Sequence, residues 1–424
     1  MQEDFLHYLW QHKKINLTQI QTTAKETIII KSVGQPNTNS GPDFFNSHLQ
    51  IGDQLWAGNV EIHIKSSDWF LHNHEQDKAY DNVILHVVWE HDTEVFNSNN
   101  THIPTLELKH YVTTSALKNY NNLLNDKKQW INCENDFPEV DDFLIQNWLE
   151  RLYIERLENK AESINQLLKN SNNDWEAVLF KMLAKSFGLK VNGDAFLSLA
   201  NSVDFAVIRK LQSKRLSLEA LFFGQSGILE QKIEDSYFLD LKKEYEYLKT
   251  KFQLTNNTVT SVQYFRLRPY NFPTIRLSQL ARLYANEQNL FSKVIDTKEL
   301  TGFYDLFSVG VSEYWETHYS FGTTSKLSKK RLTKSFIQLL LINAIIPLKF
   351  TYAKFQGKEI DGELIEIMQK VTSEKNSIID KFNSLKKVSI SALQSQALLQ
   401  LKNEYCSKNK CLHCAIGNSL LNRN

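Results

Sequence analysis

The amino-acid sequence predicts an α+β protein, with a small N-terminal α/β domain over residues 1–115 and a mainly α-helical domain over 116–424. Alternating and β-branched segments occur before about residue 115, whereas amphipathic helical periodicity dominates after it. The 424 residues include only 14 Gly and 7 Pro, which is few for an all-β chain with many tight turns. Three of the four cysteines lie close together near the C-terminus and predict a metal site that closes the helical domain.

The N-terminal domain is expected to run helix, strand, loop, two strands, helix and strand. Apolar residues recur at helical spacing over residues 3–13, and the β-branched run over 27–33 is typical of a strand. Residues 34–43 are nearly all turn formers and predict a loop. The sequence then predicts two strands joined at Gly52-Asp53, a short polar helix, a buried apolar strand and a further strand, over residues 44–51, 54–65, 72–81, 83–90 and 103–109.

The pattern changes after about residue 115. A long amphipathic helix is predicted over residues 141–168, with Trp148, Leu149 and Leu152 on its apolar side. Similar periodicity recurs over residues 175–253, 276–292, 332–346, 358–384 and 390–405. The change of period sets the expected domain break near 115–140.

Charge and hydropathy limit the expected partners and location. The 49 basic and 48 acidic residues give a net charge of +1, so any binding of nucleic acid or membrane needs a local patch. The N-terminus shows no secretory signal, and the apolar run over 336–350 is too short to span a bilayer. A cytoplasmic protein with no membrane association is therefore expected, with cysteines that are reduced or bound to metal.

The first candidate site lies on the strand over 54–65. Because strand side chains alternate between faces, Glu61, His63 and Lys65 share one face while Val60, Ile62 and Ile64 occupy the other. A carboxylate, an imidazole and an ammonium group suit metal-assisted hydrolysis, and Asp43 offers a second carboxylate. The alternative is that these residues form the solvated face of an edge hairpin.

The order of elements around Pro42-Asp43 and Glu61-Ile62-His63 resembles the core of the PD-(D/E)XK nucleases over residues 1 to about 92. In that family an aspartate and a glutamate bind Mg²⁺ and a lysine helps to activate water. The resemblance implies that Asp43 and Glu61 hold Mg²⁺ or Mn²⁺. Here His63 stands where the family has lysine, and Lys65 lies one pleat further along, so either residue could take that role or catalysis could have been lost.

A second constellation consists of histidines and an aspartate. His72, His74 and Asp77 follow the strand directly, and His86 lies within the apolar strand over 83–90. Imidazole and carboxylate groups at this spacing could bind a transition metal. The simpler interpretation is that His72 and His74 cap or solvate a helix and that His86 is a core histidine with a hydrogen-bond partner.

The cysteines give the most specific local signal. Cys406, Cys411 and Cys414 form a C-x₄-C-x₂-C pattern, and Cys133 or His413 could complete a tetrahedral site. Thiolates at this spacing suit Zn²⁺ or an iron–sulfur cluster. The outline resembles PD-(D/E)XK nucleases of CRISPR adaptation and of recombination helicase–nucleases, in which one distant cysteine and a C-terminal trio hold a [4Fe–4S] cluster. The spacing and the position of Cys133 differ, so both metals remain open, as does chance proximity of reduced thiols.

Arginines and aromatic residues alternate over residues 265–276. Arg266, Arg268, Arg276 and Arg282 could hold phosphates of DNA or RNA while neighbouring rings stack on bases. Buried arginine–carboxylate pairing at a domain junction explains the stretch equally well. The lysine-rich run over 326–334 is typical of a solvated face, with phosphate contact as the alternative.

Six segments resemble an uncharacterised bacterial domain-of-unknown-function family over nearly the whole chain. They are GPDF at 41–44, VEIHIKSSDW at 60–69, HNHEQDKAYDNVILHVV at 72–88, FRLRPYNFPTIRLSQLA at 265–281, YWETHYSFG at 314–322 and CLHCAIGN at 411–418. This resemblance implies no activity, so function rests on the candidate sites.

The sequence favours a metal-dependent nuclease or phosphodiesterase that acts on DNA or RNA. One alternative is a non-catalytic nucleic-acid-binding or scaffold protein with a vestigial site. Another is a metal hydrolase of a small substrate that uses His63, His72, His74 and Asp77.

Overall fold

The chain divides into two units that are not contiguous in sequence. The computed structural model describes residues 2–124 and 129–423. Unit 1 comprises residues 1–145 together with 402–424, and unit 2 comprises residues 146–401. The C-terminal segment with three of the cysteines therefore belongs to the same unit as the N-terminal sheet. The domain boundary predicted between residues 115 and 116 rests on a change in the periodicity of the sequence, and it remains a prediction.

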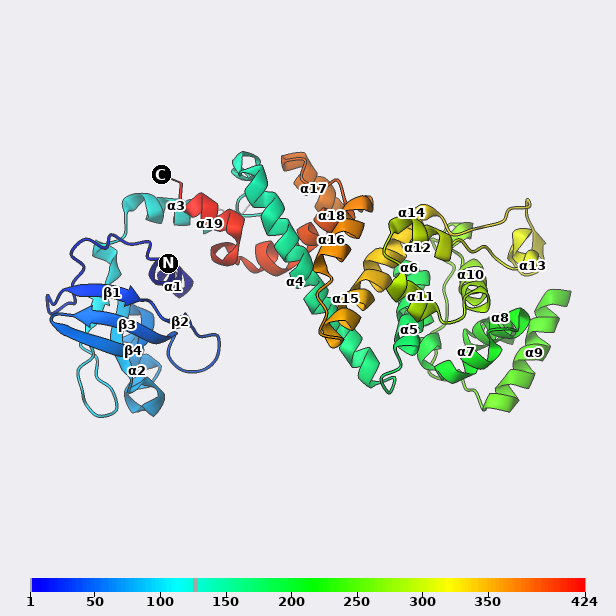
Figure 1. The fold of residues 1–424 in the computed structure, drawn as a ribbon, viewed down its shortest axis with the longest axis horizontal. Helices are drawn as coiled ribbons and strands as arrows, with labels where there is room; N and C mark the ends of the chain where they lie inside the picture. The colour runs from blue at the N-terminus through cyan, green and yellow to red at the C-terminus, as the bar shows by residue number, and fades with distance from the viewer. Residues whose placement is uncertain (1, 125–128, 424) are drawn as a thin grey trace. The chain divides into compact units, whose positions relative to one another are not determined.

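Unit 1 is built on a mixed sheet with the strand order β1-β3-β4-β5-β6, in which β2 also pairs with β3 (Figure 1). The pairs β1/β3 and β3/β4 are antiparallel, whereas β4/β5 and β5/β6 are parallel. The strands are β1 (Ile28–Ser32), β2 (Gln35–Pro36), β3 (Phe44–Ile51), β4 (Gln54–Lys65), β5 (Val83–Glu90) and β6 (Thr105–Glu107). The strands predicted at 44–51, 54–65 and 83–90 are confirmed, because local alternation and the Gly52 turn specify them.

Helix α1 (Glu3–Gln11) packs against β4 and buries Phe5, Leu6 and Leu9. The helix predicted over 72–81 is wrong. The structure has instead α2 (Asp68–Leu71) and two single 3₁₀ turns, η1 (His74–Gln76) and η2 (Lys78–Tyr80). Asn73 adopts a left-handed conformation with φ of 60°, which ends the helical path.

The remainder of unit 1 consists of short helical segments. They are η3 (Leu108–His110), α3 (Thr114–Leu124), η4 (Phe137–Glu139), η9 (Cys406–Lys408), η10 (Cys411–His413) and α19 (Ala415–Leu421). Helix α19 packs against α3, and the Asn119 side chain donates hydrogen bonds to the carbonyls of Leu421 and Arg423. These contacts hold the C-terminus within unit 1.

Unit 2 is helical apart from one short hairpin, as predicted for the C-terminal region. Its helix α4 (Asp142–Lys169) begins at the last residues of unit 1. The next helices are α5 (Trp175–Phe187), α6 (Leu189–Asn201), α7 (Phe205–Leu211), α8 (Arg215–Gln225), η5 (Ile228–Glu230), α9 (Ser236–Phe252), η6 (Pro269–Asn271), α10 (Pro273–Asn286), α11 (Leu290–Asp296) and α12 (Leu300–Leu306). They are followed by α13 (Glu313–Glu316), β7 (His318–Ser320), β8 (Thr323–Thr324), α14 (Lys334–Leu340), α15 (Ile346–Phe355), α16 (Asp361–Lys370), α17 (Ser377–Leu385) and α18 (Ala392–Gln400). The π-helical turn η7 (Leu341–Ile345) follows α14, and a second one, η8 (Leu401–Tyr405), begins at the last residue of unit 2 and continues into unit 1.

One helical segment of the described chain has the length and composition needed to cross a membrane. It covers residues 334–355, where α14, η7 and α15 follow one another. Because 78% of its most apolar window is buried within the protein, the segment is typical of a core helix. It extends beyond the apolar run over 336–350 that the sequence indicated.

Candidate metal centre

Strand β4 carries the centre of the candidate site. Glu61 and His63 lie two residues apart on one face, and their exposed fractions are 5% and 1%. Strand β4 pairs with β3 on one side and with β5 on the other, so it is not an edge strand. The solvated-face alternative is therefore wrong for these two residues. Buried polar groups need hydrogen-bond or charge partners, and several titratable side chains surround Glu61 and His63.

The two carboxylates predicted to bind a cation are interlocked. The backbone N–H of Asp43 donates to Oε2 of Glu61 at 3.0 Å, and the N–H of Ile62 donates to Oδ2 of Asp43 at 2.9 Å. Asp43 ends the loop before β3, so these bonds fix the loop against the middle of β4. Burial raises the pKa of Glu61, the hydrogen bond with His74 opposes this rise, and the Asp43 charge adds to it.

Three imidazoles surround the ring of His63, which itself adjoins Glu61. His63 Nδ1 lies 2.8 Å from His86 Nε2, and His63 Nε2 lies 3.1 Å from His72 Nδ1. His74 Nε2 lies 3.3 Å from Oε1 of Glu61, and His63 Nε2 lies 3.6 Å from the same oxygen. The ligand nitrogens of His63, His72 and His74 all lie within 4.8 Å of one another, which is a spacing that one metal ion could bridge.

Burial explains the charge state of the inner imidazoles. Burial and the neighbouring charges of His74 and His72 lower the pKa of His63 to about 3. Burial likewise holds the pKa of His86 well below its usual range. Both rings are therefore neutral near pH 7, which is the form that binds metal.

Asn73 explains how His72 and His74 reach the same place. They flank this left-handed residue, so the chain turns between them and both rings approach His63. Sequence analysis did not single out Tyr80, whose ring stacks on His74 with centroids 3.7 Å apart. Trp69 closes the other side, with edge contacts to His74 and His86.

A second group adjoins the first through Asp43. His7 Nε2 lies 3.3 Å from Oδ2 of Asp43 and 3.6 Å from Oε1 of Glu3, and the three residues offer ligand atoms within 4.8 Å of one another. Burial alone would lower the pKa of His7, but hydrogen bonds and charges from Asp43 and Glu3 raise it to about 10. Sequence analysis missed Glu3 and His7, although their i,i+4 spacing on one helix is a usable signal.

Two predicted site residues lie outside this cluster. Lys65 is exposed at the end of β4, and its charge acts on Asp92. The Asp77 side chain accepts a hydrogen bond from the N–H of Ala79 at 2.9 Å and caps the turn η2. Capping satisfies the backbone of that turn and gives Asp77 a structural role.

All four cysteines belong to unit 1 and are free thiols. Burial raises the pKa of both Cys133 and Cys406, and the charges of neighbouring thiols add to this rise. Asn132 Nδ2 lies 3.4 Å from Sγ of Cys411. The segment that carries Cys133 therefore lies beside the turn that carries Cys411.

A glycine permits this arrangement of the cysteine turns. A Cβ atom at Gly417 would overlap the carbonyl oxygen of Cys411, so α19 can pack directly on η10 only with glycine at this position. Cys414 occupies the position before the first residue of α19, and Cys411 begins η10. Short turns of this kind are typical supports for thiolate ligands.

The arginines predicted to bind nucleic acid differ in their surroundings. Arg276 is buried, donates to Asn271 and Gln279, and lies 3.7 Å from the ring centre of Phe336. Arg282 donates to the carbonyl of Val311, whereas Arg266 and Arg268 are exposed. These contacts give Arg276 a structural role, and its two hydrogen-bond partners are neutral side chains instead of carboxylates.

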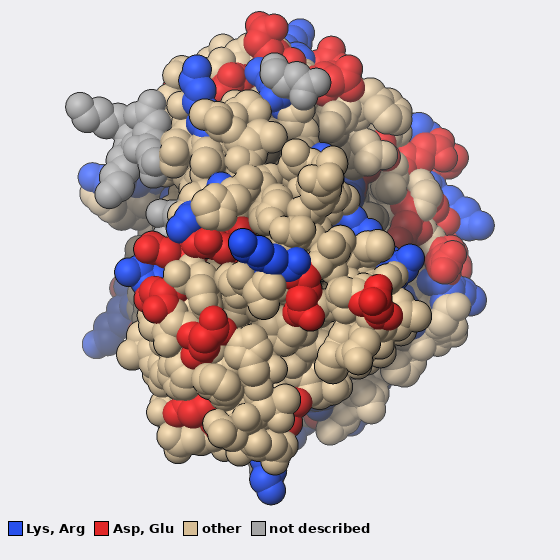
Figure 2. Space-filling model, turned by 90° about the vertical axis from the view of Figure 1, so that its left-hand side faces the viewer, with Lys and Arg blue, Asp and Glu red and all other residues tan. Residues whose placement is uncertain are grey.

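The surface charge is mixed. On the face shown in Figure 2, acidic and basic side chains are interspersed and other residues cover most of the surface. Within the lysine-rich run, Lys330 is buried and its ammonium group donates to the carbonyls of Trp315 and Glu316. The run is therefore not a uniformly solvated face.

Comparison with known proteins adds a family. The model of a family described as "Protein of unknown function (DUF2851)" matches residues 3–377. No curated protein and no solved structure matches the chain.

Proposed function

Because the chain belongs to the DUF2851 family, whose description names no activity, we propose its function from the candidate site: a divalent-metal-dependent hydrolase of phosphodiester bonds in DNA or RNA. The observation that carries the proposal is the interlocked pair of Asp43 and Glu61 beside a cluster of buried imidazoles. Two carboxylates held against one strand are the ligands that Mg²⁺ and Mn²⁺ prefer.

The chain's own residues are arranged to hold such a cation. A backbone N–H engages one oxygen of each carboxylate. Among the described residues no hydrogen bond engages Oδ1 of Asp43, and Oε1 of Glu61 faces the imidazoles of His74 and His63 at 3.3 and 3.6 Å. Each carboxylate therefore keeps an oxygen for a ligand bond, and the backbone bonds fix its orientation. A cation held there would supply charge stabilisation for the phosphate.

His63 is the better candidate for orienting the attacking water. Its Nε2 lies 3.6 Å from Oε1 of Glu61, whereas Lys65 is exposed and its charge acts on Asp92. A group that positions water has to lie next to the cation ligands. We therefore assign the role of the PD-(D/E)XK lysine to His63 in this proposal.

The histidine trio favours a second candidate, a transition-metal hydrolase of a small substrate. The ligand nitrogens of His63, His72 and His74 lie within 4.8 Å of one another, and Glu61 adds a carboxylate at 3.3 Å from His74. Buried nitrogens of His74 and His86 also lack a well-oriented hydrogen bond among the described residues. Asp77, which caps a turn, is dropped from this candidate's ligand set.

A nuclease assay tests the proposal. Single-stranded, duplex and branched DNA and RNA would be incubated with Mg²⁺, Mn²⁺ or Zn²⁺ and with wild type, Glu61→Gln, His72→Ala or His48→Ala. His48 is an exposed histidine on β3 and serves as the matched control. Cleavage with Mg²⁺ or Mn²⁺ that Glu61→Gln abolishes and His48→Ala retains would support the nuclease.

Other outcomes would contradict it. Hydrolysis of small phosphate esters that needs Zn²⁺ and is lost in His72→Ala would favour the second candidate. If the folded wild type binds nucleic acid in a gel-shift assay but cuts no substrate with any of the three metals, the protein is a scaffold with a vestigial site.

We further propose that Cys133, Cys406, Cys411 and Cys414 hold a structural Zn²⁺ or [4Fe–4S] cluster. The hydrogen bond from Asn132, the residue before Cys133, to Sγ of Cys411 and the place of all four cysteines in unit 1 support this proposal. Elemental analysis and visible absorption of protein purified without oxygen distinguish zinc from iron. Cys406→Ser is expected to lose the metal and to lower the melting temperature. Protein that contains neither metal and melts like Cys406→Ser would contradict the proposal.

A further inference from the structure

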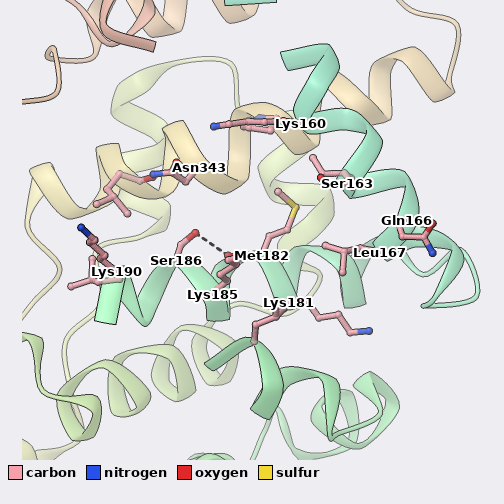
Figure 3. Close-up of a pocket in the computed structure, with 15 residues that line it drawn as sticks. Lys160, Ser163, Gln166, Leu167, Lys181, Met182, Lys185, Ser186, Lys190 and Asn343 are labelled. Carbon is pink, nitrogen blue, oxygen red and sulfur yellow. Dashed lines mark hydrogen bonds between the residues drawn. The ribbon is translucent and has the colours of Figure 1, made fainter. Parts of the chain in front are cut away.

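A large pocket lies within unit 2, far in sequence from the candidate metal centre. Its volume is about 690 Å³, and it is bounded by α4, α5, α6 and the succession α14, η7 and α15 (Figure 3). Pockets of roughly 300–1,000 Å³ are typical of small-molecule sites. The proposed hydrolase makes no use of this pocket.

The body of the pocket is apolar. Its wall includes aliphatic side chains from three directions, and the Met182 thioether lies at the centre of the view in Figure 3. The apolar lining residues include Ile164, Leu167, Met182, Leu197, Leu339 and Pro347. Such a lining favours an apolar ligand body over a polar nucleotide, because burying unpaired polar groups is costly.

All the charged residues that line the pocket are lysines. They are Lys160, Lys181, Lys185 and Lys190, and no Asp or Glu lines the described pocket. Figure 3 shows Lys160 along the top, Lys190 at the left and Lys181 at the lower right. Lys185 lies 3.8 Å from the exposed Asp194, a weak pair, and in the described chain no carboxylate lies within 4.0 Å of the other three ammonium groups. The pocket therefore presents a local positive field.

Lys160 is the inner cation of this set. Its ammonium group donates to the carbonyl of Ile342 at 3.1 Å, and this carbonyl belongs to the π-helical turn η7. That bond uses one of three N–H groups, and it is the one hydrogen bond of this ammonium group among the described residues. The neighbouring Asn343 also lines the pocket. Single turns of π-helix within α-helices are frequent at functional sites.

Burial makes the charged form of Lys160 unfavourable. Burial and the charge of Arg156 lower the pKa of Lys160 to about 7, and Glu374 opposes this effect. Lys160 is half-buried, and a cation in such a place without a paired carboxylate is stabilised when an anion binds beside it. An apolar cavity in which the Lys160 ammonium group has one hydrogen bond and, among the described residues, no carboxylate partner is thus suited to a ligand with both an apolar and an anionic part.

We propose that this pocket binds a small amphiphile with a carboxylate or phosphate head and an apolar body, with the head at Lys160. The apolar wall between α4, α5 and α14 receives the body, and the outer lysines attract the anion from solution. The proposal is independent of the hydrolase activity, since its residues lie in unit 2 and its readout is binding.

Binding of three matched probes to the full chain tests it. Dodecanoate, dodecyl phosphate and dodecanol share one apolar body and differ in the head, and calorimetric titration below micelle-forming concentrations measures their affinities. We expect both anions to bind roughly tenfold or more tightly than dodecanol, because a charged head accepts stronger hydrogen bonds from an ammonium group than a neutral hydroxyl does. The stronger of the two anions identifies the head group.

Variants separate the charge from the cavity. Lys160→Met keeps the aliphatic stem and should weaken both anions roughly tenfold while leaving dodecanol unchanged. Leu167→Trp, at a partly exposed wall position, should block all three probes. Lys354→Met, on the exposed side of α15 and outside the pocket lining, should change nothing. Equal binding of dodecanol and the anions, unchanged anion affinity in folded Lys160→Met, or no binding of any probe would overturn the proposal.

Discussion

Replacing Glu219 by Gln should remove a pH dependence from the stability of unit 2. Glu219, on α8, is buried, and Trp315 Nε1 and the Ser312 hydroxyl donate hydrogen bonds to its Oε1. Burial raises its pKa to about 7, although hydrogen bonds from Trp315, Ser312, Ser278 and Tyr237 oppose the rise. A glutamine is the same size and can accept from the same donors, so the variant should fold.

The magnitude follows from the difference between folded and unfolded pKa values. A rise from 4.5 to about 7 corresponds to about 3 kcal/mol. Because the folded pKa is raised, the protonated side chain contributes full stability below pH 4.5. That contribution is lost as pH rises toward 7, and the loss levels off above pH 7. Relative to Glu219→Gln, wild type should therefore lose about 3 kcal/mol of unfolding free energy between pH 4.5 and pH 8.

Urea unfolding at several pH values measures this difference. The control is Glu313→Gln, an exposed carboxylate that lines the same surface pocket as Glu219. Its variant should follow the wild-type pH profile, because its solvation changes little on folding. If Glu219→Gln and wild type have parallel stability profiles from pH 4.5 to 8, burial does not raise the pKa of Glu219.

Three further substitutions test the packing and polar contacts. Gly417→Ala should reduce the metal content of the proposed cysteine site and lower the unfolding free energy by about 1–3 kcal/mol, because the added methyl group overlaps the Cys411 carbonyl. A variant that keeps its metal and is as stable as wild type would contradict this prediction. Lys349→Met should cost about 2–4 kcal/mol in urea unfolding, because its buried ammonium group donates to backbone carbonyls and pairs with a carboxylate. Lys354, on the same helix, forms an exposed ion pair with Glu158, and Lys354→Met should lower the unfolding free energy by less than about 1 kcal/mol. Equal losses of unfolding free energy in Lys349→Met and Lys354→Met would refute the role of burial. Asn376→Ala should lower the thermal stability by about 1 kcal/mol, because the side chain caps α17 through two backbone N–H groups.

The sequence determined those parts of the structure that depend on local periodicity. Alternation over 54–65, the continuous apolar run over 83–90 and the Gly52 turn predict the central strands correctly. The same alternation predicts that Glu61 and His63 share a face, because period two fixes side-chain direction along any extended strand. The helical character of most residues after 140 follows equally from local spacing.

Tertiary structure alone decided which residues meet. The approach of His7 to Asp43, of His86 to His63 and of Asn132 to Cys411 joins positions that are distant in the chain, and no local period encodes such contacts. The left-handed Asn73 replaced the predicted helix by a turn. The lysine-lined pocket forms only when four separate helical segments pack together. Local spacing fixes the face on which a side chain lies, whereas packing between distant segments fixes what that side chain touches.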